Sequence, residues 1–294
     1  MDNWLEISAK TVVYAAALTA LGAGAVRRLL LPRVKAQVAP DLLLASGDRA
    51  DRVMLLAAAG LILGVLLRAW AHTVSAFGMV DALSWDNLTL IAFESRWGGG
   101  WQAQMAAAVL LFAVSAWTPR HSPLERSTTR ASATKAALVP VALAALCLAV
   151  PQTGHAAEQW LRVILHAVHL LGGGAWLGAL AIVVFTMPKA VRPHLLRAFA
   201  PVAASSVALV GISGIVMMLT YVGSPLSNLW TTDYGRRLLL KLAVVGASLV
   251  VGGLNWRALH RGNGRAIGRL PTFEASLVLV IVVLTAWLTE TAHP

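Results

Sequence analysis

The stretch "WLRVILHAVHLLGGGAWLGALAIVVFTMP", residues 160–188, is apolar along almost its whole length. A helix that spans a bilayer needs about 20 mostly apolar residues, and this stretch exceeds that length. It carries His166 and His169, followed by three consecutive glycines at 172–174. Ionisable side chains at this depth are costly and normally face the interior of a helix bundle. The stretch therefore predicts a transmembrane helix with one specialised face.

The whole chain shares this apolar character. Its 294 residues are 58% hydrophobic and 13% charged, with a mean hydropathy of +0.71, whereas a soluble protein carries about 25% charged residues. This composition predicts a polytopic membrane protein. In such a protein a net charge of +11 reflects cytoplasmic loops, so nucleic-acid binding is not expected. Cys147 is the only cysteine, which excludes an intrachain disulfide.

Eight segments are apolar and long enough to be spans, and the chain shows none of the alternating hydrophobicity of a membrane β-barrel. The first segment lacks a basic n-region and a cleavage site, so we interpret it as a retained helix. We predict an all-α bundle of about eight transmembrane helices, with an N-terminal half at 1–150 and a C-terminal half at 151–294 that form one membrane domain. The segments are 10–31, 53–76, 101–118, 136–151, 160–187, 199–222, 236–256 and 273–290.

Basic residues predict the orientation of these spans. Most of the 24 lysines and arginines lie in four loops, at 27–52, 119–135, 188–198 and 257–270. Loops rich in Lys and Arg stay on the cytoplasmic side of a membrane. Both termini are therefore expected outside, on the periplasmic side, and the intervening loop at 77–100 faces the same way.

Possible metal ligands concentrate on this outer side. Imidazole and thioether groups suit copper, and imidazole also suits zinc, iron and haem. The sequence therefore predicts a metal site in the outer half of the bundle, with His155 at its mouth and His166 and His169 deeper. Supplementary ligands would be His72, His293 and a methionine, Met217 or Met218.

The spacing of His166, His169, Gly173 and Trp176 places them on one face of a helix. A simpler interpretation stays open, because a membrane histidine also serves as a hydrogen-bond partner between helices. The glycines at 172–174 fit close helix packing or a kink, and Trp176 fits a packing role.

The stretch "LWTTDYGRRLLLKLAVVGASLVVGGLNWRAL", residues 229–259, resembles the CopD family of bacterial inner-membrane copper-resistance proteins. "TGHA" at 153–156, "LHAVHLLGGGAWLGAL" at 165–180 and the last helix, with Glu274 at its cytoplasmic end, are also similar to that family. The resemblance covers roughly 150–294, whereas residues 1–150 match only in helix count and topology. The matching motif positions are Thr232, Tyr234, Gly235, Leu238, Lys241, Asn255 and Arg257.

This resemblance implies a copper-homeostasis protein of the bacterial inner membrane that imports copper from the periplasm toward the cytoplasm. It also implies a periplasmic CopC-like copper carrier as partner, for which the net-acidic loop at 77–100 is the expected receiving surface. An enzyme is not expected. A related superfamily includes haem proteins, so the alternative is a haem b oxidoreductase with His72 as the ligand from a second helix. A structural subunit without either ligand is the third possibility.

Three motif positions have a direct physical interpretation. Gly235 permits a tight entry into the seventh span, where Tyr234 suits the membrane interface. Lys241 lies about one and a half turns inside, and a buried ammonium needs a partner. Glu290 and Asp233 are the expected partners for an ion pair, and a proton-relay or gating role is the alternative.

The predicted orientation can be tested with reporter fusions. Reporters that are active only in the cytoplasm should be active when fused within 119–135 or 188–198, and inactive when fused within 77–100. An active periplasmic reporter at 119–135 would contradict the orientation.

Overall fold

The computed structural model describes residues 4–117, 130–154, 159–222, 225–260 and 270–291, and almost all of these are helical. Eight helical stretches are long and apolar enough to cross a membrane, which confirms the predicted all-α membrane bundle. The elements in chain order are α1 (Trp4–Ala25), η1 (Val26–Leu30), α2 (Leu31–Val34), α3 (Pro40–Phe77), η2 (Asp81–Leu83), α4 (Trp85–Thr89), η3 (Leu90–Glu94), α5 (Arg96–Ala116), α6 (Arg130–Ala149), η4 (Val150–Thr153), α7 (Trp160–Gly173), η6 (Gly174–Gly178), α8 (Ala179–Phe185), α9 (Arg192–Val222), α10 (Asn228–Thr231), α11 (Asp233–His260) and α12 (Leu270–Thr289).

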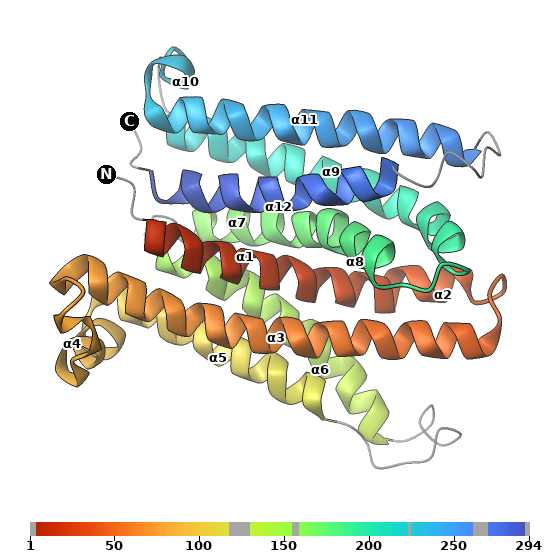
Figure 1. Ribbon diagram of the computed structural model, residues 1–294, viewed down its shortest axis with the longest axis horizontal. Coiled ribbons are helices and arrows are strands. Elements are labelled where there is room, and N and C mark those ends of the chain that lie inside the picture. The colour runs from red at the N-terminus through yellow and green to blue at the C-terminus, as the bar shows by residue number, and fades with distance from the viewer. Residues whose placement is uncertain (1–3, 118–129, 155–158, 223–224, 261–269, 292–294) are drawn as a thin grey trace.

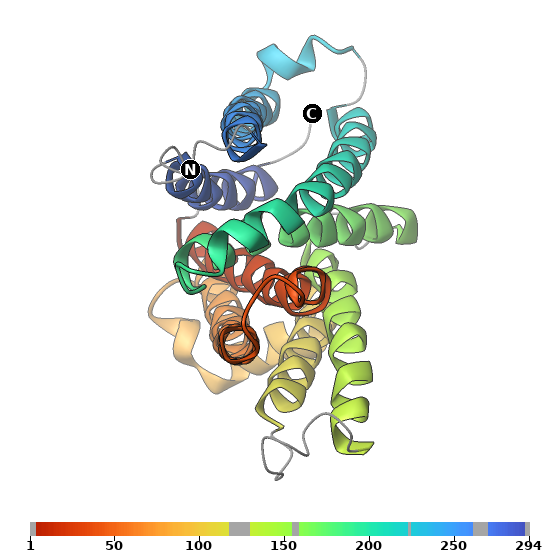
Figure 2. The ribbon, with the colours of Figure 1, turned by 90° about the vertical axis from the view of Figure 1, so that its right-hand side faces the viewer.

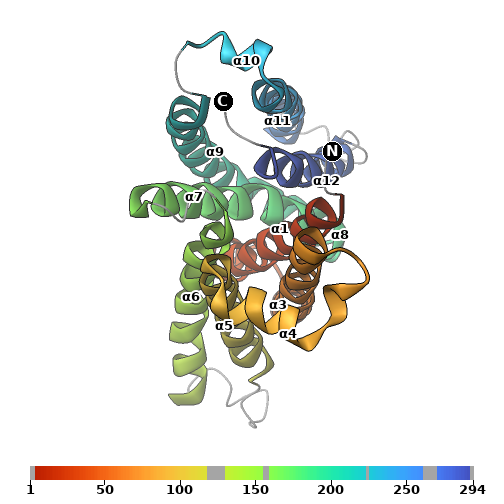
Figure 3. The ribbon, with the colours of Figure 1, turned by 90° about the vertical axis from the view of Figure 1, so that its left-hand side faces the viewer.

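Helix α1 lies in the middle of the bundle. In the end views, α3, α5 and α6 lie on one side of it and α9, α11 and α12 on the other (Figures 2 and 3). The start of α1 and the end of α12 lie at the same end of the bundle (Figure 1), where the rings of Trp4 and Trp287 stack with centroids 6.3 Å apart. Eight spans bring both termini to the same end of the bundle. We call the end with Trp4 and Trp287 the outer end, and the opposite end the inner end.

Several helices extend beyond the spans predicted from hydropathy. Helix α3 has 38 residues, which is about 57 Å at 1.5 Å per residue and longer than the roughly 30 Å hydrocarbon core. Its first turns, together with η1 and α2, occupy most of the 27–52 segment that was expected to be a loop. Pro40 at the start of α3 explains the late chain reversal, because proline suits the first turn of a helix. The expected outer loop at 77–100 contains η2, α4 and η3.

Two glycines let α1 and η6 touch along their backbones. A Cβ atom built on Gly22 would lie 2.3 Å from the carbonyl carbon of Gly178, and one built on Gly178 would lie 2.0 Å from the carbonyl oxygen of Leu18. No side chain fits at either position. Small residues at membrane-helix interfaces allow such close approach, which strengthens van der Waals packing.

The glycine run at 172–174 serves the same close packing. A Cβ on Gly172 would lie 2.9 Å from Val210 of α9, and one on Gly174 would lie 2.3 Å from Leu21 of α1. The run leads directly into η6, a π-helical segment between α7 and α8. Segments of this kind often occur at functional sites in α-helices. The predicted role of these glycines in close packing therefore agrees with the structure at Gly172 and Gly174.

Gly178→Ala should destabilise the bundle, because its methyl group would force the backbones of α1 and η6 apart. We expect a loss of about 1–3 kcal/mol, as for overpacking elsewhere, measured by unfolding in detergent. Gly211→Ala on α9 is the matched control, since a Cβ there meets no other atom within 4 Å. Equal stability of the two variants would show that the contact of α1 with η6 is unimportant.

Candidate metal-binding cavity

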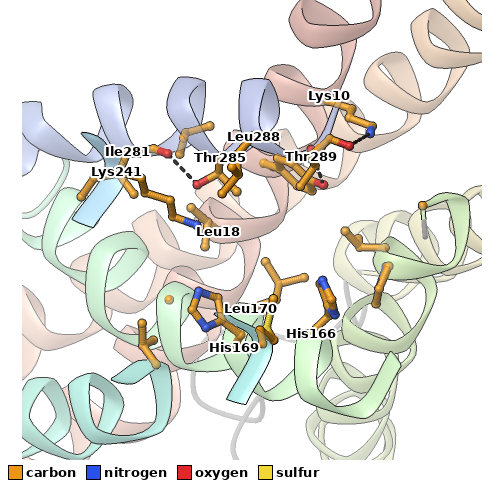
Figure 4. Close-up of a pocket in the computed structure, with 18 of the residues that line it drawn as sticks. Lys10, Leu18, His166, His169, Leu170, Lys241, Ile281, Thr285, Leu288 and Thr289 are labelled. Atoms are coloured by element: carbon orange, nitrogen blue, oxygen red, sulfur yellow. Dashed lines mark hydrogen bonds between the residues drawn. The ribbon is translucent and has the colours of Figure 1, made fainter. Parts of the chain in front are cut away.

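A cavity of about 180 Å³ lies in the outer half of the bundle, between α1, α7, α9, α11 and α12. Helix α7 directs His166 and His169 into it, as expected for residues three positions apart on one helical face (Figure 4). Its other walls are mainly apolar. The polar or titratable side chains that line it are Lys10, Tyr14, Thr153, His166, His169, Tyr221, Tyr234, Lys241, Thr285 and Thr289.

The hydrogen bond of His166 fixes which ring nitrogen is free. Its Nδ1 lies 2.8 Å from the backbone carbonyl oxygen of Arg162, one turn earlier in α7. A carbonyl oxygen only accepts hydrogen bonds, so Nδ1 carries the proton and donates it. In the neutral ring Nε2 then keeps its lone pair. Tyr221 of α9 packs edge-on against the imidazole, with ring centroids 5.6 Å apart.

His169 has the same arrangement through a different partner. Its Nδ1 lies 3.1 Å from the hydroxyl oxygen of Ser213 on α9. The Ser213 hydroxyl lies 2.6 Å from the carbonyl oxygen of Leu209 and 3.3 Å from that of Val210. When its single proton goes to either carbonyl, the hydroxyl accepts from the imidazole. Gly214 lies beside this ring, where a Cβ would make an ordinary van der Waals contact of 3.4 Å with Cε1 of His169. The Nε2 atom of His169 therefore also keeps its lone pair.

Neither Nε2 atom is bonded to any part of the chain that the structure describes. Metal-binding histidines commonly donate Nδ1–H to a carbonyl or another acceptor, which orients the ring and leaves Nε2 for the ion. The two rings thus offer two nitrogen ligands toward one space. The thioether of Met217, from α9, also lines the cavity.

Lys241 enters the cavity from α11, on the side opposite α7 (Figure 4). No carboxylate in the described ranges forms an ion pair with it. The expected pairing with Glu290 is wrong, because Glu290 instead forms an ion pair with Lys10 of α1. Both ends of that pair lie near the outer end, where α1 meets α12, while Lys241 lies deeper. The other expected partner, Asp233, is exposed at the start of α11.

His72 lies away from the cavity. Its Nδ1 is 3.1 Å from Oε1 of Glu6 on α1, and its ring stacks on Trp97 with centroids 4.3 Å apart. The guanidinium of Arg68 lies over the Trp97 ring, 5.6 Å from its centroid. This cluster joins α1, α3 and α5 near the outer end, and the structure does not bring His72 together with His166 and His169.

The remaining predicted ligands divide into two groups. Met218 is half-buried beside the apolar cluster of Tyr221 and Tyr234, and its neighbour Met217 is the methionine that lines the cavity. His155 and His293 lie outside the described residues. Within the described ranges, no three His, Cys, Asp or Glu side chains converge as a metal site.

The haem alternative does not fit this donor set. A haem iron with two axial histidines needs them on opposite faces of the ring, and His166 and His169 lie on one helix. His72 was the expected ligand from a second helix, but it is engaged with Glu6 and Trp97. Among the described residues that line the cavity, no helix other than α7 supplies an imidazole.

The other motif residues lie around this cavity and a second one beyond it. Trp176 is only 3% exposed and borders both. Gly235 gives α11 its tight start, since a Cβ there would lie 2.2 Å from the carbonyl oxygen of Asn228. Near the inner end, the Asn255 amide donates to Oε2 of Glu274 at 2.6 Å and links α11 to α12. Sequence reasoning missed Ser213 and Tyr221, the neighbours of the two histidines.

Comparison with known proteins bears on the resemblance inferred from the motifs. The family described as copper resistance protein D matches residues 193–288. A copper resistance protein D from Pseudomonas syringae pv. tomato is 29% identical over 267 residues, which cover 80% of this chain and 82% of that protein. The copper transport protein CutJ from Bacillus subtilis (strain 168) is 26% identical over 159 residues, or 51% of this chain and 29% of that longer protein. No solved structure matches.

The match at 193–288 contains nearly all of α9, all of α11 and most of α12, and each of these helices contributes residues to the walls of the cavity. The similarity to the Pseudomonas protein extends over most of the chain. The resemblance to the CopD family of copper-resistance proteins is therefore confirmed.

Proposed function

We propose that this protein takes up copper on the periplasmic side, binds it between His166 and His169, and passes it toward the cytoplasm. The observation that carries the proposal is the pair of Nε2 lone pairs in one cavity, neither of them bonded to a described residue. Imidazole and thioether are ligands that suit copper. The relatives named for copper resistance and copper transport support the same substrate.

The charge of Lys241 favours transport over permanent storage. Its ammonium enters the same cavity as the two imidazoles and opposes a second positive charge. A transported ion must be held strongly enough to enter and weakly enough to leave. Two imidazoles and a thioether attract copper, and Lys241 limits how tightly it is held.

We place the protein in the bacterial inner membrane, with the outer end of the bundle in the periplasm. Most lysines and arginines lie in the four segments at 27–52, 119–135, 188–198 and 257–270. Segments rich in Lys and Arg stay on the cytoplasmic side, which leaves both termini on the periplasmic side. Copper would then enter near Lys10 and Thr289, which line the cavity close to the outer end. Movement from there toward the inner end is import.

A periplasmic CopC-like carrier is the proposed source of the copper. The segment between α3 and α5 lies at the outer end (Figure 1) and carries the exposed acidic residues Asp81, Asp86 and Glu94. Exposed apolar side chains accompany them, including Met79, Leu83 and Trp85. Apolar contacts with a surrounding of charges are typical of protein-binding surfaces. This segment is the proposed docking surface.

His166→Ala and His169→Ala should each weaken copper binding, and the double variant should abolish binding in the outer cavity while folding persists. Each substitution removes one of the two nitrogen ligands. Copper bound per chain, measured by elemental analysis of purified protein, and thermal unfolding test both parts. Because copper binds neutral imidazole, binding to the parent should also weaken as the pH falls below the ordinary range of histidine titration.

His194→Ala is the control for this experiment, because His194 is remote from the cavity and contacts Gln37 at 3.3 Å. If the double alanine variant binds as much copper as the parent with equal affinity, the two histidines are packing residues and the proposal fails. A loss of stability without a loss of copper would have the same meaning.

Ser213→Ala should lower copper affinity by roughly 10–100-fold, the usual effect of removing a group that orients a metal ligand. The substitution leaves His169 in place but removes the hydroxyl that bonds to its Nδ1. Ser205→Ala is the matched control, since its hydroxyl bonds only to carbonyl groups of its own helix. A titration with copper that gives equal affinities for both variants would exclude an orienting role for Ser213.

A further inference from the structure

A second cavity, of about 350 Å³, lies between α9, α11 and α12 toward the inner end of the bundle. We propose that this inner cavity binds a cation through oxygen atoms of Glu274, Ser248 and Asn255. The cation is either copper that has passed the outer cavity or a proton that moves in exchange for it. The identity of the cation rests on the proposed function, but the existence of the site does not.

The carboxylate of Glu274 is the centre of the site. Glu274 is 4% exposed, and its Oε2 accepts a hydrogen bond from the Asn255 amide. No described lysine, arginine or histidine forms an ion pair with it. A buried carboxylate without a counter-charge is costly in a membrane, so a bound cation would offset that cost.

The described arginines on neighbouring elements are engaged elsewhere or exposed. Arg27 pairs with Asp51, Arg28 donates to the Ala136 carbonyl, and Arg192 donates to the Met187 carbonyl. Arg197 of α9 and Arg257 of α11 are exposed. Among the described residues that line the inner cavity, Glu274 is the only one with a side chain that titrates.

Gly252 of α11 makes room for the second carboxylate oxygen of Glu274. A Cβ built on Gly252 would lie 2.8 Å from Oε1, so a larger residue there would displace the carboxylate. Ser248 lies four residues before Gly252, on the same face of α11. It lines the cavity, is fully buried, and its hydroxyl oxygen has no hydrogen-bond partner.

The unsatisfied Ser248 hydroxyl independently indicates a ligand. Serines in membrane helices usually bond to a carbonyl one turn earlier, as Ser46, Ser213 and Ser276 do here. Ser248 does not, although it is buried where an unmade hydrogen bond is costly. A cation, or water bound to it, would accept this hydroxyl as a ligand.

The inner cavity differs from the outer one in donor type. The outer cavity offers imidazole nitrogens and a thioether beside several hydroxyls, whereas the inner cavity offers a carboxylate, an amide and a hydroxyl and no imidazole among its described lining residues. Carboxylate, amide and hydroxyl oxygens are harder ligands than the imidazole and thioether groups that suit copper, and a carboxylate can also take up a proton. Trp176 lines both cavities and lies between these two sets of donors.

The test uses the purified full-length protein in lipid nanodiscs, with Glu274→Gln as the central variant. Copper per chain is measured by elemental analysis, and infrared difference spectra between acidic and alkaline pH detect a carboxyl group that gains and loses a proton. Asp41→Asn is the control, because Asp41 is an exposed carboxylate in the first turn of α3 and lines neither cavity.

Loss of about one equivalent of copper in Glu274→Gln, with the outer site intact, identifies copper as the cation. Unchanged copper with loss of a buried-carboxyl signal from the infrared spectra identifies the proton. If neither changes, the inner site does not exist. A His166→Ala/His169→Ala variant is measured in the same experiment. If the proposed function is correct, this variant loses copper from the outer cavity alone, whatever the result for Glu274→Gln. The two proposals can therefore fail separately.

Ser248→Ala provides a second variant in case Glu274→Gln does not fold. It should lower the apparent affinity of the inner site for the identified cation by roughly tenfold, since a ligand to a charged group is lost. Its thermal stability should stay equal or rise, because the hydroxyl has no protein partner. Increased stability without any change in cation binding would overturn the assignment of Ser248 as a ligand.

Discussion

The backbone contact between Gly22 of α1 and Gly178 of η6 is the constraint on which the rest of the bundle depends. It fixes a central helix against the segment that carries the histidines, at a distance that no side chain would allow. Helix α1 then packs against α3 on one side and α12 on the other. Leu18 of α1 and Trp176 of η6 both line the outer cavity. Its width is therefore set by an interaction that involves no functional group.

Two carboxylates near the outer end are bonded to side chains other than Lys241, so they do not neutralise its charge in the outer cavity. Lys10 pairs with Glu290, and Glu6 pairs with His72. Lys241 is left with no carboxylate partner among the described residues. The two cavities thus have opposite electrostatic character, with a cationic group in the outer one and an anionic group, Glu274, in the inner one. This polarity would attract a cation inward once it has passed Trp176.

The sequence predicted the spans well, because the length and apolarity of a membrane helix are local properties. It also predicted that His166 and His169 share a face, which depends only on helical periodicity. It did not predict the partners of Lys241 and His72, or which of Met217 and Met218 lines the cavity. These depend on how helices cross and rotate against one another, which is set by contacts such as Gly22–Gly178 between residues distant in the chain. The Ser213 hydroxyl was missed for the same reason.

The π-helical segment η6 also fixes the rotational phase between the two halves of its span. Each residue of an α-helix advances by about 100°, so a single inserted residue turns everything that follows by that angle. Here the wider turn at Gly174–Gly178 absorbs such an insertion between His169 and Leu180, which border different cavities. A one-residue deletion in the glycine run would therefore turn η6 into a regular helix and leave Leu180 facing the inner cavity. A one-residue deletion in a regular part of the same span has no wide turn to absorb it, so it would rotate Leu180 away from that cavity by about 100°.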